Sequence, residues 1–397
     1  MRRAGVAVIA FAAGAAIAAS AAGAGNRDLS FAIGKALFER AWVPAPSSTR
    51  ANDGLGPVFN ARACSACHQG LDRAQRMDDG QGGFTHPGMV LKLSDARGAP
   101  DPLYGAQLQT AAIAGFVPEG RLVLSEGDLV IGNLGAGPLA PSTHMGLRAA
   151  PALRGLGLLA SVPDEEILSR ADPDDEDGDG VSGRANWVFG ADGRKRLGRF
   201  GLKASGVTLA EQTEAAFFND LGMSTPGHSD PAGDCRSQSC RAGPHGGTEA
   251  EPEIRGDLVA MLADYLARVP PPAAAKPDGA GEKMFVATGC SSCHVPTLTA
   301  PGGEVPAYSD LLLHDLGPGL DGGATEPGVQ GGEWRTAPLW GLSRALGAKA
   351  GLLHDGRASD VAEAIAHHGG EGAGARARFQ ALTKADRATL LRYVEGL

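Results

Sequence analysis

Two segments of the chain carry apolar residues at helical spacing. In residues 258–269 and 390–397, leucine, valine and tyrosine side chains recur three and four positions apart, which places them on one face of a helix. The first segment runs into three prolines, and the second ends the sequence. The pattern therefore predicts two amphipathic helices, each closing one part of the molecule.

A weak internal repeat lies upstream of each predicted helix. Residues 34–38 and 281–285 share the pattern Gly-x-x-(Leu/Met)-Phe, and each predicts an amphipathic turn of helix. Alternating strand patterns are few, and residues 122–131 give the best of them. The repeat and the helical segments predict a mainly α fold built from two related domains.

Each copy of the repeat leads to a Cys-x-x-Cys-His motif. In this motif the two thiols attach to the vinyl groups of one haem, and the histidine binds its iron. A zinc site or a disulfide is the alternative, but zinc needs four ligands, and no second cysteine pair lies at zinc-site spacing. The sequence predicts two c-type haems, one on Cys64, Cys67 and His68 and the other on Cys290, Cys293 and His294.

The proline-rich residues 270–281 form the clearest linker in the chain. The part before this linker is much longer than the part after it, so we expect an acidic, glycine-rich insertion around 163–248. The expected fold is two cytochrome c-like domains with long irregular loops. The predicted boundaries are 1–24 for a signal peptide, 25–270 for the N-terminal haem domain, 271–280 for the linker and 281–397 for the C-terminal haem domain.

The first residues predict export. Arg2 and Arg3 precede an apolar run at 6–17 and then small residues, as in a secretory signal peptide that is cleaved near Ala22 or Ala24. A retained membrane anchor is the alternative, and no other segment is long and apolar enough to span a bilayer, so stable membrane insertion is not expected. Export together with haem attachment predicts the bacterial periplasm.

Composition narrows the class of partner. The 397 residues carry a formal net charge of −9, so nucleic acid is not expected as a partner. The same charge makes a basic electron-transfer protein a plausible partner. The 59 glycines and 26 prolines are typical of a chain rich in loops. Cys235 and Cys240 are the only cysteines outside the haem motifs, and in an exported chain they predict a disulfide.

Several longer motifs resemble a known family. They lie at 54–60, 104–109, 177–186 (Asp-Gly-Asp-Gly-Val-Ser-Gly-Arg-Ala-Asn), 197–204 and 333–341. These motifs resemble those of the bacterial di-haem oxidoreductases, which are described as peroxidases and sometimes as thiol oxidoreductases. Their superfamily includes di-haem cytochrome c peroxidases, di-haem enzymes that mature tryptophan-derived cofactors, and haem oxygenases that cleave rubber. Fold and cofactor follow from such a resemblance more safely than substrate does.

The resemblance implies ligands for the second haem. His354-Asp355-Gly356 resembles the segment of di-haem peroxidases that touches a haem propionate, and their axial ligand follows fourteen residues later, which is His368 here. His368 replaces the methionine of the peroxidases and faces inward on a helix that we expect to begin near Asp360 with a capping box. A histidine that merely stabilises the helix end is the alternative. A second imidazole gives a lower haem potential than methionine does.

Three arginines are candidate partners for the haem propionates, because guanidinium groups bind carboxylates through paired hydrogen bonds. They are Arg184, Arg335 and Arg357, and surface solvation is the alternative for each.

The sixth ligand of the first haem stays open. His86 follows His68 at about the spacing at which resting peroxidases place a displaceable histidine, and Met89 and His144 are the alternatives. An open or displaceable position lets peroxide or oxygen bind iron.

Peroxide cleavage also needs a group that moves a proton between the two oxygens. The peroxidases use a glutamate, at a position where this chain resembles the family but carries Ala160. Glu119 and Glu165 are the remaining candidates for this role.

An acidic loop predicts a cation site. Asp175-x-Asp177-x-Asp179-Gly180 matches the first half of a calcium loop, but Asn186 stands at the twelfth position, so the segment is not an EF-hand. The resemblance adds that di-haem peroxidases hold calcium between their domains. A solvated acidic loop is the alternative.

The resemblance implies an enzyme in which the C-terminal haem receives electrons from a periplasmic protein and the N-terminal haem reacts with an oxidant such as hydrogen peroxide. A non-catalytic di-haem electron carrier and an oxygenase that acts on an organic substrate are the alternatives. Trp187, Trp334 and Trp340 are candidates for an electron relay between the haems, and core packing is the alternative for each.

Overall fold

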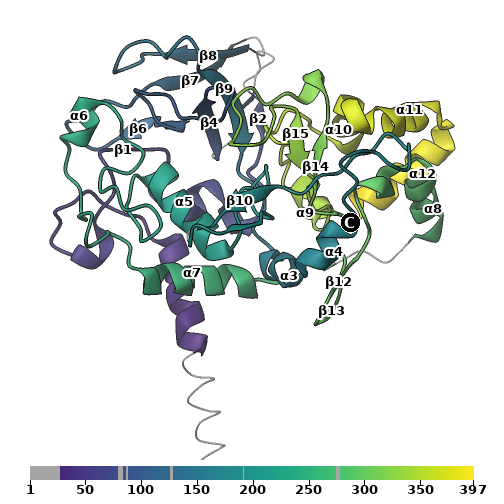
Figure 1. Ribbon diagram of the computed structural model, residues 1–397, viewed down its shortest axis with the longest axis horizontal. Helices are drawn as coiled ribbons and strands as arrows, with labels where there is room; N and C mark the ends of the chain where they lie inside the picture. The colour runs from purple at the N-terminus through teal and green to yellow at the C-terminus, as the bar shows by residue number, and fades with distance from the viewer. Residues whose placement is uncertain (1–26, 79–83, 86–87, 126–127, 191, 274–277) are drawn as a thin grey trace, which may run out of the picture.

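The fold comes from a computed structural model that describes residues 27–78, 84–85, 88–125, 128–190, 192–273 and 278–397 (Figure 1). The signal peptide expected at 1–24 and the predicted iron ligand His86 lie outside these residues. None of the described helices is long and apolar enough to cross a membrane.

The elements are short, and loops connect most of them. The labelled helices are α2 (Cys64–Cys67), α3 (Leu156–Ser161), α4 (Asp164–Leu168), α5 (Leu209–Leu221), α6 (Gln238–Arg241), α7 (Gly256–Arg268), α8 (Gly279–Ala287), α9 (Leu342–Gly347), α10 (Val361–His367), α11 (Ala373–Ala381) and α12 (Lys384–Glu395). Residues 27–39 form a further helix. The 3-10 helices are η1 (Arg50–Asn52), η2 (Gln69–Leu71), η3 (Cys290–Ser292), η4 (Pro318–Leu320) and η5 (Gly370–Gly372).

The strands pair only locally. They are β1 (Val58–Phe59), β2 (Met77–Asp78), β3 (Phe84–Thr85), β4 (Met89–Ser94), β5 (Gln107–Leu108), β6 (Ala111–Ala112), β7 (Arg121–Ser125), β8 (Asp128–Gly132), β9 (His144–Ala149), β10 (Trp187–Phe189), β11 (Lys195–Leu197), β12 (Leu298–Ala300), β13 (Gly303–Val305), β14 (Leu313–Asp315) and β15 (Glu333–Arg335). Within the described residues, β5, β4 and β9 form a three-stranded sheet and the other strands form two-stranded sheets.

The expectation of a mainly α fold is wrong. The structure is 33% helical and 16% strand, and the strands are spread over many small sheets. Most strands have two or three residues, which is too short for the alternation of apolar and polar residues to stand out in the sequence. Even the strand expected at 122–131 is a hairpin of β7 and β8, with Leu122 opposite Ile131.

The first part of the chain packs around α5, α7 and the helix at 27–39. Phe31 lies edge-on to Tyr265 of α7, with ring centroids 5.1 Å apart, and Phe217 of α5 joins the same apolar cluster. A Cβ atom on Gly34 would lie 2.2 Å from the carbonyl oxygen of Met261, so only glycine allows the helix at 27–39 to approach α7 this closely. The helix predicted at 258–269 is therefore present as α7 and closes this core.

The last part of the chain packs around α8, α10 and α12. Phe285 of α8 and Leu390 and Tyr393 of α12 are buried together. A Cβ atom on Gly281 would lie 2.3 Å from the Cβ of Tyr393, so this glycine sets the close contact of α8 with α12. The helix predicted at 390–397 is present as the second half of α12.

A third apolar cluster joins the two parts. Leu159 of α3, Ile167 of α4 and Phe200 pack in one buried cluster with Leu298 and Leu311, which come from beyond the expected linker. Figure 1 shows β10, α3 and α4 between α5 and α7 on one side and α11 and α12 on the other. Packing therefore ties the two parts of the molecule together.

Candidate functional site

Both Cys-x-x-Cys-His motifs fold into the same short turn. The backbone amide of His68 donates to the carbonyl of Cys64, and that of His294 donates to the carbonyl of Cys290, each over 3.0 Å. One turn of helix thus carries both thiols and brings the histidine to its end. The four cysteines are free of disulfides.

Three histidines share one hydrogen-bond arrangement. The Nδ1 atom of His68 lies 2.9 Å from the carbonyl oxygen of Pro151, that of His294 lies 2.9 Å from the carbonyl oxygen of Tyr308, and that of His368 lies 2.8 Å from the carbonyl oxygen of Ala364. A carbonyl can only accept, so Nδ1 carries the proton and Nε2 keeps its lone pair. Metal-binding histidines are usually oriented in this way.

Burial keeps these imidazoles neutral. Loss of hydration lowers the pKa of His68 and of His368, and it lowers the pKa of His294 to about 4. His368 adds to the effect on His294, so the two rings lie close enough to interact. Neutral imidazoles with a free Nε2 are the form that binds iron.

A cavity of about 570 Å³ joins the C-terminal motif to His368. Its size is within the range of cofactor pockets. Its walls are mostly apolar, and they include Leu339, Trp340, Leu352, Val361, Ala364 and Ile365 together with Cys290, Cys293, His294 and His368. Two histidines that expose Nε2 and two free thiols therefore surround one apolar space.

The cavity is bordered by buried and partly buried cations that lack carboxylate partners among the described residues. Arg73 and Arg335 line the cavity, and Arg148 and Lys203 lie behind Trp334. Their side chains donate hydrogen bonds to backbone carbonyls. The acceptors are Gly351 and Leu353 for Arg73, Leu147, Gly322 and Ala324 for Arg148, Gln330, Gly331 and Glu333 for Lys203, and Gly201 and Thr336 for Arg335.

Burial destabilises the charged form of these cations. Loss of hydration lowers the pKa of Arg73, Arg148 and Arg335 to about 10 each and that of Lys203 to about 7. Buried charges need partners of opposite sign, and the propionate groups of haem are such partners. The donor set and the charges of the site therefore fit haem.

The predicted propionate arginines differ in their surroundings. Arg335 is the one that faces the cavity without a carboxylate. Arg357 already pairs with Asp355 at 2.6 Å, and Arg184 pairs with Glu333. No sequence pattern assigned a role to Arg73, Arg148 or Lys203, although Lys203 lies in the family-like motif at 197–204. The three residues come from distant segments and meet only in the fold.

His354 and Trp334 form one stacked pair in the cavity wall. Their ring centroids lie 3.8 Å apart at an interplanar angle of 10°, and Lys203 Nζ lies 3.6 Å from the Trp334 centroid. Burial first, and then Arg148, lowers the pKa of His354 to about 2, so this ring is neutral. Trp340 also lines the cavity, whereas Trp187 is 44% exposed on the β10–β11 hairpin.

A buried ion cluster borders the same cavity. His314 lies between two carboxylates, with Nε2 2.8 Å from Asp310 and Nδ1 2.7 Å from Glu371. Glu371 also accepts hydrogen bonds from the amide and the hydroxyl of Ser182. The sequence did not predict this cluster, because Ser182, His314 and Glu371 lie 57 or more residues apart, and only Asp310 is close to His314 along the chain.

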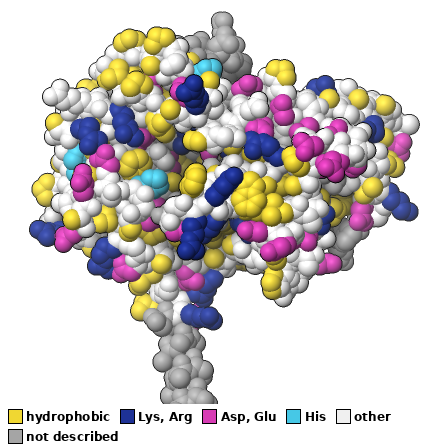
Figure 2. All heavy atoms as spheres, viewed as in Figure 1, with side chains coloured by type: hydrophobic (Ala, Val, Ile, Leu, Met, Phe, Trp, Pro, Cys, Tyr) yellow, Lys and Arg dark blue, Asp and Glu magenta, His cyan; other side chains and the backbone are white. Residues whose placement is uncertain are grey.

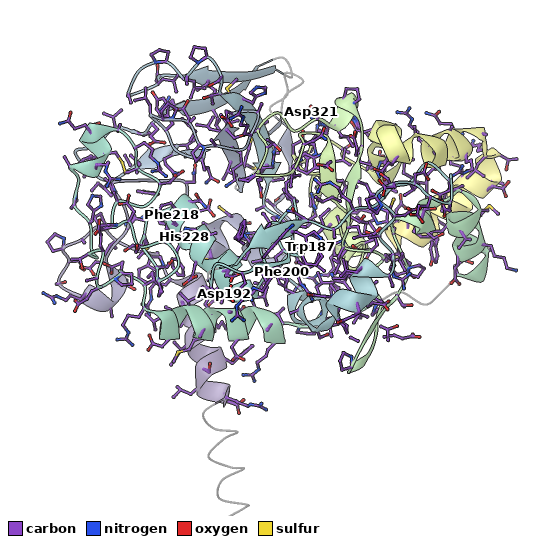
Figure 3. All side chains as sticks on the ribbon, in the orientation of Figure 1. Trp187, Asp192, Phe200, Phe218, His228 and Asp321 are labelled. Carbon is purple, nitrogen blue, oxygen red and sulfur yellow. A yellow bond between two sulfur atoms is a disulfide. The ribbon has the colours of Figure 1, made fainter. Side chains whose placement is uncertain are left out.

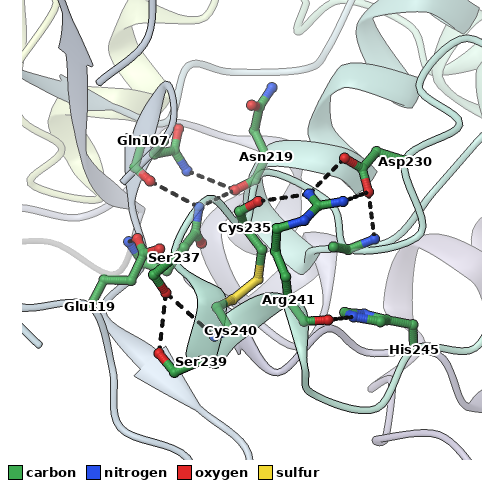
Figure 4. Close-up of a disulfide and its surroundings, with 12 residues drawn as sticks. Gln107, Glu119, Asn219, Asp230, Cys235, Ser237, Ser239, Cys240, Arg241 and His245 are labelled. Carbon is green, nitrogen blue, oxygen red and sulfur yellow. Dashed lines mark hydrogen bonds and ion pairs between the residues drawn. A yellow bond between two sulfur atoms is a disulfide. The ribbon is translucent and has the colours of Figure 1, made fainter. Parts of the chain in front are cut away.

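The two predicted acid/base residues lie away from the cavity lining. Glu119 is buried near the disulfide (Figure 4), where it accepts from the amide of Gln109 at 2.9 Å. Burial, together with Asp234, raises its pKa to about 8. Glu165 is exposed in the first turn of α4.

The predicted disulfide between Cys235 and Cys240 is confirmed, with Cα atoms 5.7 Å apart. Both residues are buried against Val58 and Ala232. Figure 4 shows the bond beside the hydrogen-bonded pair of Gln107 and Asn219.

The acidic loop brings three carboxylates together. Among the described residues, oxygen atoms of Asp172, Asp175 and Asp177 lie within 4.8 Å of one another, and this is the one such cluster of metal-binding side chains. Asp179, which the motif included, instead accepts from the amide of Val181. No comparable cluster of cysteine and histidine of the zinc type occurs in these parts of the chain.

Two Cys-x-x-Cys-His motifs, neutral histidines with a free Nε2, an apolar cavity and cations without carboxylate partners among the described residues are the features of a haem redox site. A family model described as "Di-haem oxidoreductase, putative peroxidase" matches residues 1–78 and 132–397. The chain therefore belongs to the di-haem oxidoreductase family.

Other comparisons add little. A solved structure of Kuenenia stuttgartiensis hydrazine synthase, pressurised with 20 bar xenon, is similar at 19% identity and a TM-score of 0.26. The similarity covers 37% of this chain and 57% of the hydrazine synthase chain, and it carries no argument on fold or activity. A search of curated proteins finds no match.

Proposed function

We propose that this chain is an exported oxidoreductase that holds two c-type haems and reduces peroxide. Cys64, Cys67 and His68 are assigned to one haem, and Cys290, Cys293, His294 and His368 to the other. The observation that carries the proposal is the shared Nδ1–carbonyl bond of His68, His294 and His368, which leaves three neutral Nε2 atoms free. The Cys235–Cys240 disulfide supports export to an oxidising compartment, the periplasm.

The two haem sites receive different roles in this proposal. Haem iron supplies one-electron chemistry and binds an oxidant where a coordination position is open. His294 and His368 together close the C-terminal site, so this site transfers electrons. The His68 site is then the reactive one, and His86 stays the predicted displaceable ligand.

A short hydrogen-bonded path supports electron exchange between the sites. The His68 ring donates to the carbonyl of Pro151, and the amide of Ala149, two residues earlier, donates to the carbonyl of His354 over 2.8 Å. The His354 ring then stacks on Trp334 in the wall of the C-terminal cavity. Two hydrogen bonds and one ring contact thus join the two sites.

Spectra of the purified protein test the assignment. We expect a mass increase of two haems, one low-spin centre with two imidazoles, and one high-spin or displaceable centre. His368→Ala should open the C-terminal site to cyanide or carbon monoxide, and His367→Ala, one position along the same helix, should not. The assignment of His368 fails if its replacement leaves the low-spin spectrum unaltered.

Turnover separates the candidate functions. A peroxidase consumes peroxide and oxidises a reduced cytochrome, and His68→Ala should lower this rate by more than about 100-fold, because it removes an iron ligand and not only its support. An electron carrier shows two low-spin centres and no peroxide turnover. An oxygenase consumes oxygen with an organic substrate in place of peroxide.

A further inference from the structure

Two large aromatic side chains project from the β10–β11 hairpin. Phe189 is 77% exposed and Trp187 is 44% exposed, and the Nζ of Lys195 lies 5.9 Å from the Trp187 ring centroid. Trp187 lies near the middle of the broad face that Figure 3 presents. Figure 2 shows an apolar patch at the centre of this face with basic side chains beside it. Exposed aromatic side chains of this kind are typical of docking sites.

The charged side chains of the hairpin that lack a partner of opposite charge are basic. Arg194 and Lys195 are exposed and have no carboxylate partner among the described residues. The third basic residue, Arg196, is held by Glu211 at 2.8 Å and by Asp192 at 3.5 Å. The free charge beside the two aromatic rings is therefore cationic, although the whole chain is acidic.

An apolar groove of about 850 Å³ adjoins the hairpin. Its lining includes Leu197 of β11 and Ala260, Ala263 and Ala267 of α7. Two acidic residues at its edge are already neutralised, because Asp164 pairs with Arg199 and Asp264 pairs with Arg268. We call Trp187, Phe189, Arg194, Lys195, Ala263 and Ala267 the hairpin–groove surface.

One helix separates this surface from the C-terminal cavity. On α3, Leu156 and Leu159 line the cavity, whereas Ala160 and Ser161 line the groove. An α-helix with its side chains is about 10–12 Å thick. A Cβ atom on Gly157 would lie 1.9 Å from the Ala267 carbonyl oxygen, so α3 is held tightly against α7. A partner on the surface therefore sits about one helix width from the cavity.

We propose that the hairpin–groove surface docks an acidic electron-transfer protein. The inference rests on the proposed function, because the cavity behind α3 must hold a redox centre. In each encounter the reduced partner loses one electron and this chain gains it, so two encounters supply the two electrons that, with two protons, convert one peroxide into two waters. The acidic partner differs from the basic one that net charge predicts, because charges within a Debye length of the contact govern docking.

Binding and reduction of the oxidised di-haem protein test the proposal with named probes. An acidic [2Fe–2S] ferredoxin, with its low potential, serves as the partner-like donor, basic cytochrome c as the opposite binding probe, and reduced methyl viologen as a small donor. We expect salt-sensitive binding of oxidised ferredoxin that is tighter than binding of cytochrome c. Arg194→Glu/Lys195→Glu should lower ferredoxin affinity and the bimolecular rate by about tenfold or more, and Phe189→Ser should weaken binding as well.

The controls isolate docking from redox function. Lys283→Glu/Lys384→Glu makes the same two charge reversals at exposed positions of α8 and α12 and should leave ferredoxin binding unaltered. Reduction by methyl viologen should be equal in all variants; a protein that lacks haem bands or is not reduced by viologen contradicts the proposed function itself.

Three results overturn the docking assignment while the function stands. They are an unaltered ferredoxin affinity in Arg194→Glu/Lys195→Glu, tighter binding of cytochrome c than of ferredoxin, and a Phe189-dependent self-association or attachment to anionic vesicles. The last result would assign the surface to a second copy of the chain or to a membrane.

Discussion

The His314 side chain is a buried cation between two carboxylates. Burial opposes its protonation, but the hydrogen bonds with Asp310, Cys293 and Glu371 outweigh burial and raise its pKa to about 12. Burial likewise opposes ionisation of Glu371, yet His314 and the amide of Asp315 lower its pKa to about 2. Each charge of this cluster is thus stable only while the others are present.

We expect His314→Gln to lower the free energy of unfolding by about 3–5 kcal/mol, because the substitution leaves Asp310 and Glu371 buried without a cation. Urea unfolding at neutral pH measures the loss. His144→Gln, at an exposed position of β9, should change stability by less than about 0.5 kcal/mol. Equal stability of the two variants would show that the cluster contributes nothing.

The same cluster predicts a pH window. The pKa of His314 is raised from 6.5, so its stabilisation is full below pH 6.5 and is lost as the pH rises towards about 12. The pKa of Glu371 is lowered from 4.5, so its stabilisation is full above pH 4.5 and is lost as the pH falls towards about 2. The stability difference between the wild type and His314→Gln should therefore be largest between pH 4.5 and 6.5, and a difference that grows towards pH 9 would contradict this assignment.

His368 follows the last residue of helix α10, so the stability of this helix affects the position of the His368 side chain. The side chain of Asp360 accepts from the amide of Glu363 at 2.8 Å, as the predicted capping box requires, while the Glu363 carboxylate binds Ser359. Asp360→Ala should cost about 1 kcal/mol and should raise the high-spin fraction of the C-terminal haem, because His368 closes the same helix. Thr383→Ala removes the equivalent cap of α12 and should cost similar stability with no spectral change. Identical haem spectra in both variants would show that the first turn of α10 does not affect how His368 binds the C-terminal haem.

The acidic loop predicts a stabilising cation. If calcium binds Asp172, Asp175 and Asp177 of the folded protein alone, a hundredfold excess over Kd adds about 2.7 kcal/mol of stability. EGTA should then lower Tm and calcium should restore it. Asp172→Asn should abolish this response, whereas Asp174→Asn, in the same loop but outside the cluster, should keep it. An unchanged Tm with EGTA would remove the calcium prediction.

The features that the sequence predicted correctly are those that depend on neighbouring residues in the chain. The amphipathic spacing of α7 and α12, the cap of α10 and the Cys235–Cys240 disulfide all follow from residues close together in sequence. The sequence did not predict the two-residue and three-residue strands. Turns and tertiary packing determine where these strands form, and so few residues show no periodic pattern of their own. Family likeness pointed to His368, and Arg335 is among the predicted propionate partners, but nothing in the sequence assigned such a role to Arg73, Arg148 or Lys203.

Those cations show where sequence reasoning ends. Arg73, Arg148 and Lys203 stand in unrelated segments, and a lone basic residue is far more often exposed than buried. Only the fold brings them together, with Arg148 and Lys203 next to Trp334 and Arg73 in the lining of the same cavity. Tertiary contact, and not local sequence, decides that this wall is positive.

At the scale of the whole molecule, the residues that directly follow the N-terminal Cys-x-x-Cys-His motif contact the segments around the C-terminal cavity. Arg73 donates to the carbonyl of Gly351, Asp72 pairs with Arg344 at 2.7 Å, and Gln75 bridges to Ala350. The cluster around Leu159 and Leu298 adds apolar contact between the same parts. Loss of structure on one side therefore removes support from the other.

We expect that Cys290→Ala/Cys293→Ala, which blocks covalent attachment of the C-terminal haem, destabilises both parts of the chain. The cavity of about 570 Å³ would lose its apolar filling, and Arg73 and Arg335 in its lining would have no anion beside them. Hydrogen exchange should rise in 281–397 and also in the described part of 156–209, which contributes Leu159, Ile167 and Phe200 to the shared cluster. Cys235→Ser/Cys240→Ser removes two buried sulfurs remote from the cavity and should raise exchange only around its own loop. Exchange that rises in 281–397 alone would instead show that the C-terminal part folds independently and that the shared cluster transmits no stability.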